Sequence, residues 1–91
     1  MEEKFLAAVA AAREKAEKLG VRIRPVQDMQ SAHRVLLGHR QSDGFHLLAQ
    51  KGQLGLTLEA LAVRKEFTAL FSDEEVNNAL DRLLFAGYSF R

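Results

Sequence analysis

Apolar residues recur at helical spacing in the last part of the chain, between residues 72 and 87. Residues three and four positions apart lie on one face of a helix, so this spacing predicts an amphipathic helix. Ser72 and Glu75 stand at the positions of a capping box, which predicts that Ser72 caps the helix. The apolar stripe consists of Val76, Ala79, Leu80, Leu83, Leu84 and Gly87.

Aromatic residues at the C-terminus fall outside this stripe. Phe85 lies about opposite its centre, and Tyr88 and Phe90 follow. Exposed aromatic side chains dominate many interfaces, so we predict that Phe85, Tyr88 and Phe90 contact a partner protein. The alternative is that they belong to the core. In that case Tyr88 packs back on Leu83 or Leu84, and the first helix covers Phe85.

A second apolar seam predicts a long N-terminal helix over about residues 2–19. Acidic residues near its start and lysines near its end suit the helix dipole, and Gly20 is placed to end it. The seam is short and its later members are small, so it predicts a core helix, with a dimer seam as the alternative. Its members are Phe5, Val9, Ala12, Ala16 and Leu19.

The middle of the chain predicts a connector and a short helix. Residues 21–26 alternate apolar and basic side chains and include a proline, so we expect an extended connector or a short edge strand. Val21 and Ile23 would face inward. Asp28 is placed to cap a helix that runs to Leu37.

Two further short helices are predicted before residue 72. Ser42 or Asp43 is placed to cap the first, and Thr57 to cap the second. The second carries two apolar stripes that are rotated relative to each other. It is therefore either buried on two sides or broken near residues 64–66. The stripes consist of Leu58, Leu61 and Ala62, and of Val63, Phe67 and Leu70.

These elements predict an all-α fold, an orthogonal bundle of four or five helices with a C-terminal helical hairpin. The 91 residues suffice for one domain, 1–91, with a single modest core. An apolar share of 47%, a charged share of 27% and a single proline argue against disorder.

Composition also restricts function. The chain has no cysteine, which excludes disulfides, thiolate catalysis and cysteine-bound metals. The start Met1-Glu2-Glu3 has the wrong charge for a signal peptide, and no apolar run reaches the length of a membrane span. We therefore expect a soluble, cytoplasmic protein without membrane contact.

The sequence shows no common catalytic motif. Phosphate-binding glycine loops and a nucleophile elbow are both missing. His33, His39 and His46 lack the spacing of four residues that a helical metal site requires, and a site built on His39 and His46 would need Asp43 as well. We expect no cofactor, no metal and no enzymatic activity.

Basic residues concentrate in the middle of the chain and acidic residues near its end. This pattern favours an oriented contact with a second copy or another protein. The alternative is that the arginines neutralise the phosphates of a nucleic acid or another anion. Four arginines face a single acid, Asp28, between residues 21 and 40: Arg22, Arg24, Arg34 and Arg40.

The segment Leu58–Ala62 followed by residues 72–88 resembles the second and third helices of a winged helix-turn-helix domain. The resemblance covers about a third of the chain and implies nucleic-acid binding through the C-terminal helix. Two features depart from that family. The segment between the two helices exceeds the usual turn of three or four residues. The helix also opens with Asp73, Glu74 and Glu75, which phosphates would repel.

Taken together, the patterns predict a small non-enzymatic regulatory or adaptor protein that acts through protein contacts and can self-associate. The alternative is a nucleic-acid-binding protein that uses the basic centre or a degenerate helix-turn-helix.

Overall fold

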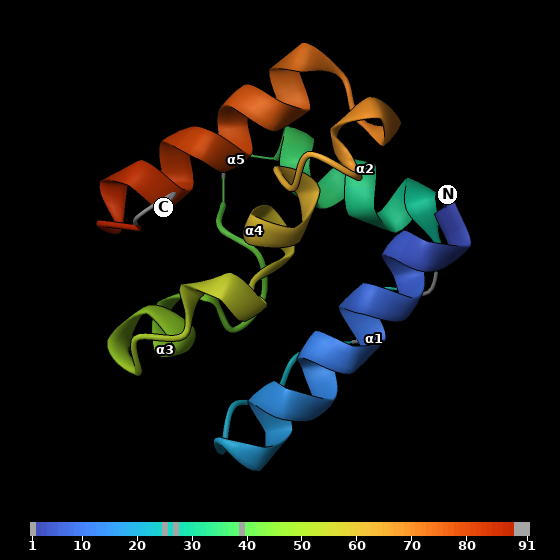
Figure 1. Ribbon diagram of the computed structural model, residues 1–91. Helices are drawn as coiled ribbons and strands as arrows, with labels where there is room; N and C mark the ends of the chain where they lie inside the picture. The colour runs from blue at the N-terminus through green and yellow to red at the C-terminus, as the bar shows by residue number, and fades with distance from the viewer. Residues whose placement is uncertain (1, 25, 27, 39, 89–91) are drawn as a thin grey trace.

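The computed structural model describes residues 2–24, 26, 28–38 and 40–88. Within these residues the chain forms five α-helices and two short 3-10 helices, and no β-strand (Figure 1). The predicted all-helical fold class is therefore confirmed. In chain order the elements are α1 (Glu2–Lys18), α2 (Met29–Leu37), α3 (Phe45–Gln50), η1 (Leu54–Leu56), α4 (Leu58–Ala62), η2 (Thr68–Leu70) and α5 (Asp73–Phe85).

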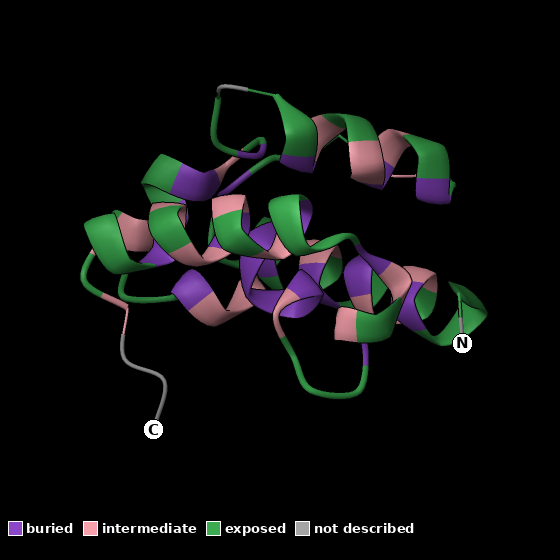
Figure 2. Ribbon diagram, turned by 90° about the horizontal axis from the view of Figure 1, so that it is seen from above, coloured by how far each residue is buried: buried purple, intermediate pink, exposed green. Residues whose placement is uncertain are grey.

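The short helix α4 lies at the centre of the bundle. All five of its residues are buried, and it packs against α5, α1 and η1 (Figure 1). Buried positions gather in the middle of the molecule, whereas the outer faces of the helices are exposed (Figure 2). The main core consists of Phe5, Val9, Ala12, Met29, Ala32, Leu36, Leu58, Leu61, Ala62, Phe67, Phe71 and Ala79.

The seam of α1 is part of this core. Phe5, Val9, Ala12 and Ala16 are buried within the chain itself, so they are not free to form a dimer seam. Leu19, the fifth predicted member, is 39% exposed. The backbone turns at Gly20, with φ of 85°, and directs Val21 into the core in its place.

The connector and α2 follow the predicted pattern. Residues 21–24 belong to no helix or strand, with Val21 buried and Ile23 half-buried. Asp28 caps α2, because its carboxylate accepts a hydrogen bond of 2.8 Å from the amide of Ser31. The predicted Pro25 lies outside the described residues.

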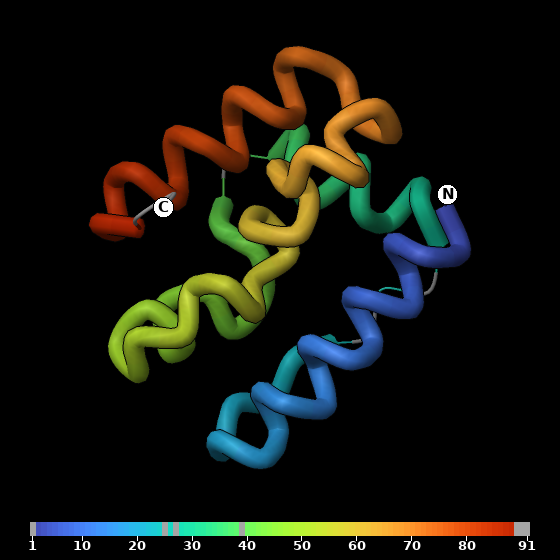
Figure 3. Tube along the Cα trace, viewed as in Figure 1, coloured from blue at the N-terminus to red at the C-terminus, as the bar shows by residue number. Residues whose placement is uncertain are grey.

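The chain breaks between α4 and α5, as one of the two alternatives predicted. Thr57 caps α4, which ends at Ala62, and the chain then turns through η2 before α5 begins (Figure 3). The break lets Phe67 enter the same core as Leu61, although the two belong to differently rotated stripes. Two-sided burial of one long helix is therefore not needed.

Ser72 caps α5 through the predicted capping box. The stripe is only partly buried: Ala79 and Leu83 are covered, whereas Leu84 is 60% exposed. The prediction that Leu84 belongs to the buried stripe is therefore wrong. Its side chain points about 100° away from that of Leu83, which belongs to the second core cluster.

No helix in the described part of the chain combines the length and apolar character needed to cross a membrane.

Candidate functional site

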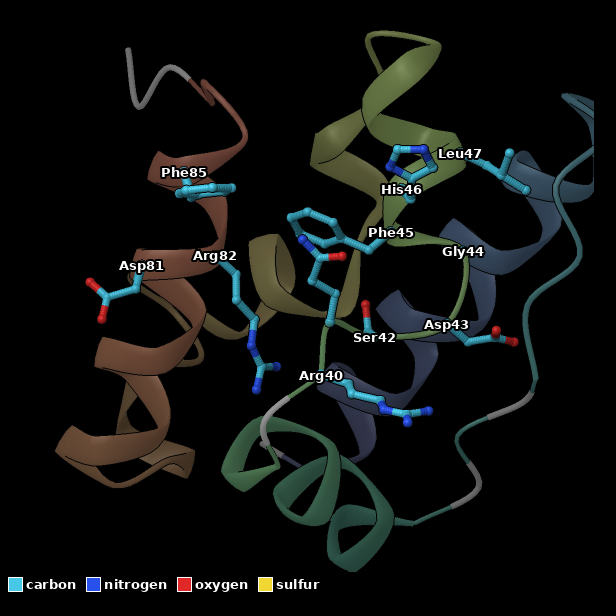
Figure 4. A pocket seen from close by; sticks show the side chains of 11 residues that line it. Arg40, Ser42, Asp43, Gly44, Phe45, His46, Leu47, Asp81, Arg82 and Phe85 are labelled. Carbon is cyan, nitrogen blue, oxygen red and sulfur yellow. The ribbon is translucent and has the colours of Figure 1, made fainter.

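An open groove of about 860 Å³ lies between α5 and the start of α3 (Figure 4). Phe85 stands on the α5 side, and Phe45 and His46 come from α3. The segment 40–44 forms the rest of the wall. Phe85 is 91% exposed and Leu47, on the far side of the groove, is 45% exposed. The groove therefore offers apolar side chains to solvent beside charged ones.

The turn that leads into α3 is set by Gly44, which has a φ of 77°. A side chain here would meet Ile23 at 2.8 Å and Val21 at 3.1 Å, so both backbone conformation and space favour glycine. Gly44 is also the residue that precedes α3, without a side-chain cap. The prediction that Ser42 or Asp43 caps this helix is therefore wrong. Asp43 instead accepts a hydrogen bond of 2.8 Å from the amide of Arg24.

Ser42 is held by Glu59, a fully buried carboxylate on the central helix α4. Its amide donates to Glu59 at 2.8 Å, and its hydroxyl donates to the other carboxylate oxygen. Arg82 of α5 completes the cluster at 3.4 Å from Glu59. A buried carboxylate requires such partners, because an unpaired charge away from water is strongly unfavourable.

Arg82 has a second role at the C-terminal end of α2. It donates to the carbonyls of Val35 at 3.2 Å and Leu36 at 3.3 Å, and also to that of Gly38. Asn78, one turn earlier on α5, donates to Leu36 at 3.0 Å. Carbonyls at the end of a helix carry the negative end of its dipole, so a cation stabilises them, and the carbonyl of Val35 also accepts from the amide of Gly38.

Asp81 and Arg82 are neighbours on α5 but differ in burial. The side chain of Arg82 is 11% exposed, whereas Asp81 is exposed and points away from α3 (Figure 4). The sequence pattern did not indicate the burial of Arg82. Sequence reasoning also missed Glu59. One signal was present, since Glu59 is the single charged residue in the otherwise apolar segment 58–62.

A second polar contact joins α2 to the start of α5. His33 Nδ1 lies 2.5 Å from Glu75 Oε2, while Glu75 Oε1 accepts from the amide of Ser72 at 2.8 Å. Burial raises the pKa of the Glu75 carboxyl, but the hydrogen bonds from Ser72 and His33 outweigh burial. They hold this pKa below its ordinary value.

We expect Glu75 to make the protein sensitive to acid. Its pKa is lower in the folded chain than in the unfolded chain, so the carboxylate stabilises the fold fully above its ordinary value of 4.5. This stabilisation is lost as pH falls through the folded pKa. Chemical denaturation of the parent and Glu75→Gln should show a difference in unfolding free energy that shrinks between neutral pH and pH about 3.

Glu74→Gln is the matched control for this titration, because Glu74 lies in the same turn and is exposed. The difference in unfolding free energy between Glu74→Gln and the parent should change less over the same pH range. If the difference in unfolding free energy between Glu75→Gln and the parent did not change with pH, the lowered pKa of Glu75 would be contradicted.

The predicted aromatic contact residues differ in their exposure in the structure. Phe85 is exposed on the last turn of α5. Tyr88 is half-buried and packs against the second core cluster, which contains Phe45, Leu54 and Leu83. This is the fold-back that the alternative interpretation anticipated. Phe90 lies outside the described residues.

The four central arginines are all exposed, and they line two hollows. Arg34 and Arg40 line a hollow of about 390 Å³. Arg22 and Arg24 line another of about 990 Å³. Asp43 lines both hollows.

The hydroxyl groups near these sites serve hydrogen bonds that stabilise the fold. Ser42 donates to Glu59, which is already paired with Arg82. His33 contacts Glu75 and not the hydroxyl of Ser72. An activated nucleophile requires a direct hydrogen bond from the hydroxyl to a base that can take its proton. The hydroxyl of Ser42 instead joins the wall of the groove to α4.

Within that same part of the chain, no three histidine or carboxylate residues come together as metal ligands. His33 is engaged with Glu75, and His46 contacts Gln50 at 3.1 Å on the exposed side of α3. His39 lies outside the described residues.

No protein-family model matches this chain, and comparison with curated proteins and with solved structures finds no match either.

Proposed function

We propose that this chain is a small non-enzymatic regulatory or adaptor protein that binds another protein through the groove between α3 and α5. The observation that carries the proposal is the 91% exposure of Phe85 beside this groove. Leu84, its neighbour on α5, is 60% exposed. Adjacent exposed apolar side chains of this size are typical of contact sites. A cytoplasmic location is part of the same proposal.

The charges around the groove support a partner that carries both an apolar and an acidic side chain. Arg40 and His46 line the groove and are exposed, so they can pair with a carboxylate. A second copy of the chain meets this requirement. Asp81 precedes Phe85 by one helical turn on α5, so one copy can insert Phe85 while its Asp81 approaches Arg40 of the other.

We expect Phe85→Ala to separate binding from stability. Because Phe85 makes few contacts within the chain, its truncation should change the unfolding free energy by no more than about 1 kcal/mol. Loss of an interface anchor should weaken self-association or partner capture by about 1 kcal/mol or more. Chemical denaturation, sedimentation velocity and affinity capture from native lysate provide the three measurements.

Leu37→Ala is the control for this experiment. Leu37 is 48% exposed on α2 and does not line the groove, so its truncation removes a comparable exposed apolar side chain. Binding that is lost equally in both variants would point to nonspecific adhesion. A loss of about 3 kcal/mol or more of stability in Phe85→Ala would instead make this residue part of the core.

A second candidate function is binding to nucleic acid. The observation that favours it is the arrangement of Arg22, Arg24, Arg34 and Arg40 in two hollows that share Asp43. Exposed guanidinium groups bind phosphate oxygens with little sequence readout. The acidic start of α5 does not oppose this candidate, since it does not line either hollow.

For this second candidate we expect weak duplex binding at low salt that falls steeply as salt rises. Arg34→Glu should abolish it, whereas Lys51→Glu makes the same charge change outside both hollows and should retain more binding. Fluorescence anisotropy with labelled duplex DNA and RNA measures the affinity of the parent and of the two variants at each salt concentration. Submicromolar affinity at physiological salt, lost in Arg34→Glu, would favour nucleic acid over a protein partner. Lysate capture with and without nuclease tests the same choice.

A further inference from the structure

A separate cavity of about 360 Å³ lies beneath the connector that joins α1 to α2. Its walls are mostly apolar and come from distant parts of the chain. Val9 belongs to α1, Val35 to α2, and Leu58 and Leu61 to the central helix α4. The volume is near the lower end of the range for small-molecule sites, about 300 to 1,000 Å³. The cavity therefore has the size and lining to enclose one short apolar chain.

Three charged residues line this cavity, Arg13, Arg24 and Asp43. Arg13 is oriented by its own contacts, since Nε donates to the carbonyl of Ile23 at 2.7 Å and Nη2 lies 3.4 Å from Glu17. Arg24 is exposed, and among the described residues its side chain has no carboxylate partner within salt-bridge distance. Asp43 is the one acid that lines the cavity, and its Oδ2 accepts from the amide of Arg24. Arg13 is already paired with Glu17, so the guanidinium of Arg24 is the cation at this cavity that no described carboxylate pairs.

We propose that this cavity binds a straight-chain carboxylate. The alkyl chain lies against Val9, Val35, Leu58 and Leu61, and the carboxylate is held by Arg24 with Arg13 beside it. The apolar wall stabilises the chain by removing it from water. The guanidinium groups select an anionic head over a neutral one, because hydrogen bonds between charged groups are stronger than neutral ones. The cavity shares the wall residues 41–43 with the groove at Phe85, but its apolar lining and Arg24 do not belong to the groove, so the proposal does not depend on protein binding.

The direct test is isothermal titration of the full chain with hexanoate, octanoate and decanoate, each below its micelle concentration. The matched straight-chain alcohols serve as controls for apolar binding alone. We expect carboxylate affinity to rise with chain length until the cavity is filled. Each alcohol should bind at least about tenfold more weakly than the carboxylate of the same length. Equal affinity for alcohol and carboxylate, or no binding of any carboxylate at millimolar concentration, would overturn the proposal.

Variants test the position of the ligand. Arg24→Gln keeps the backbone amide that Asp43 accepts from, and should weaken decanoate binding about tenfold. Arg22→Gln removes an exposed arginine that does not line the cavity and should leave binding unchanged. Val35→Phe fills the apolar end and should abolish binding while circular dichroism remains helical. If this variant does not fold, the comparison of Arg24→Gln with Arg22→Gln decides alone.

Phe85→Ala separates this site from the groove. Because Phe85 does not line the cavity, the variant should bind decanoate with parental affinity even where it loses partner binding. Decanoate binding that persists in Arg24→Gln at full strength, or that disappears in Phe85→Ala, would place the ligand elsewhere and refute the assignment.

Discussion

Replacing Arg82 by methionine should lower the unfolding free energy by about 3–5 kcal/mol. The methionine retains much of the apolar volume but leaves the fully buried Glu59 without its cation. The C-terminal carbonyls of α2 also lose one of their donors, while Leu36 keeps its hydrogen bond from Asn78. The total stability of a small domain is about 5–15 kcal/mol, so the variant should be marginal or unfolded at physiological temperature. Urea denaturation followed by circular dichroism measures the change.

Two comparisons identify the cause of this loss. Asp81→Asn alters the exposed neighbour of Arg82 and should change stability by no more than about 0.5 kcal/mol. Adding Glu59→Gln to Arg82→Met should cost less than the sum of the two single changes, because the buried charge is removed together with its partner. A loss below about 1 kcal/mol in Arg82→Met would show that the pair contributes little to the fold.

Phe5→Ala should have a comparable effect on stability, about 3–5 kcal/mol. Phe5 is fully buried, and its ring packs edge to face on two other rings. The distance between ring centroids is 5.2 Å to Phe67 and 5.0 Å to Phe71. Truncation leaves a cavity where α1 meets the segment between α4 and α5, and both aromatic pairs are lost. Chemical denaturation of Phe5→Ala under the same conditions as Phe85→Ala measures the difference in unfolding free energy.

Phe85→Ala is the matched control, because it makes the same chemical change at a residue that is 91% exposed. The two variants should differ by about 2 kcal/mol or more in unfolding free energy. Equal losses would mean that Phe85 is covered in solution, and would undermine the binding surface. Only Phe85→Ala should weaken partner capture while the chain stays folded.

The groove and the buried cluster are physically connected. Glu59 holds Ser42 in the wall of the groove, and Arg82 joins that carboxylate to α5, which carries Phe85. The same buried carboxylate therefore links both walls of the groove, the segment at Ser42 and α5.

The chain sequence alone determined most of the helix boundaries. Asp28, Thr57 and Ser72 each cap a helix as predicted, because a cap joins a side chain to an amide only three residues away. Gly20 ends α1 for a similarly local reason, since glycine readily adopts the positive φ that follows the last helical turn. The exposure of Phe85 also followed from its angle to the apolar stripe of its own helix.

Tertiary structure decided the contacts that define the candidate sites. Ser42 meets Glu59, and Arg82 meets the end of α2, across distances in sequence that no local pattern encodes. The side chain of Ser42 is suitable for a helix cap, but it donates instead to the buried carboxylate of Glu59, because a buried carboxylate requires hydrogen-bond donors. Leu84 remained 60% exposed because none of the described elements covers its side of α5. Local hydrogen bonds fix where helices begin and end, whereas burial and charge pairing depend on which helices come to lie side by side.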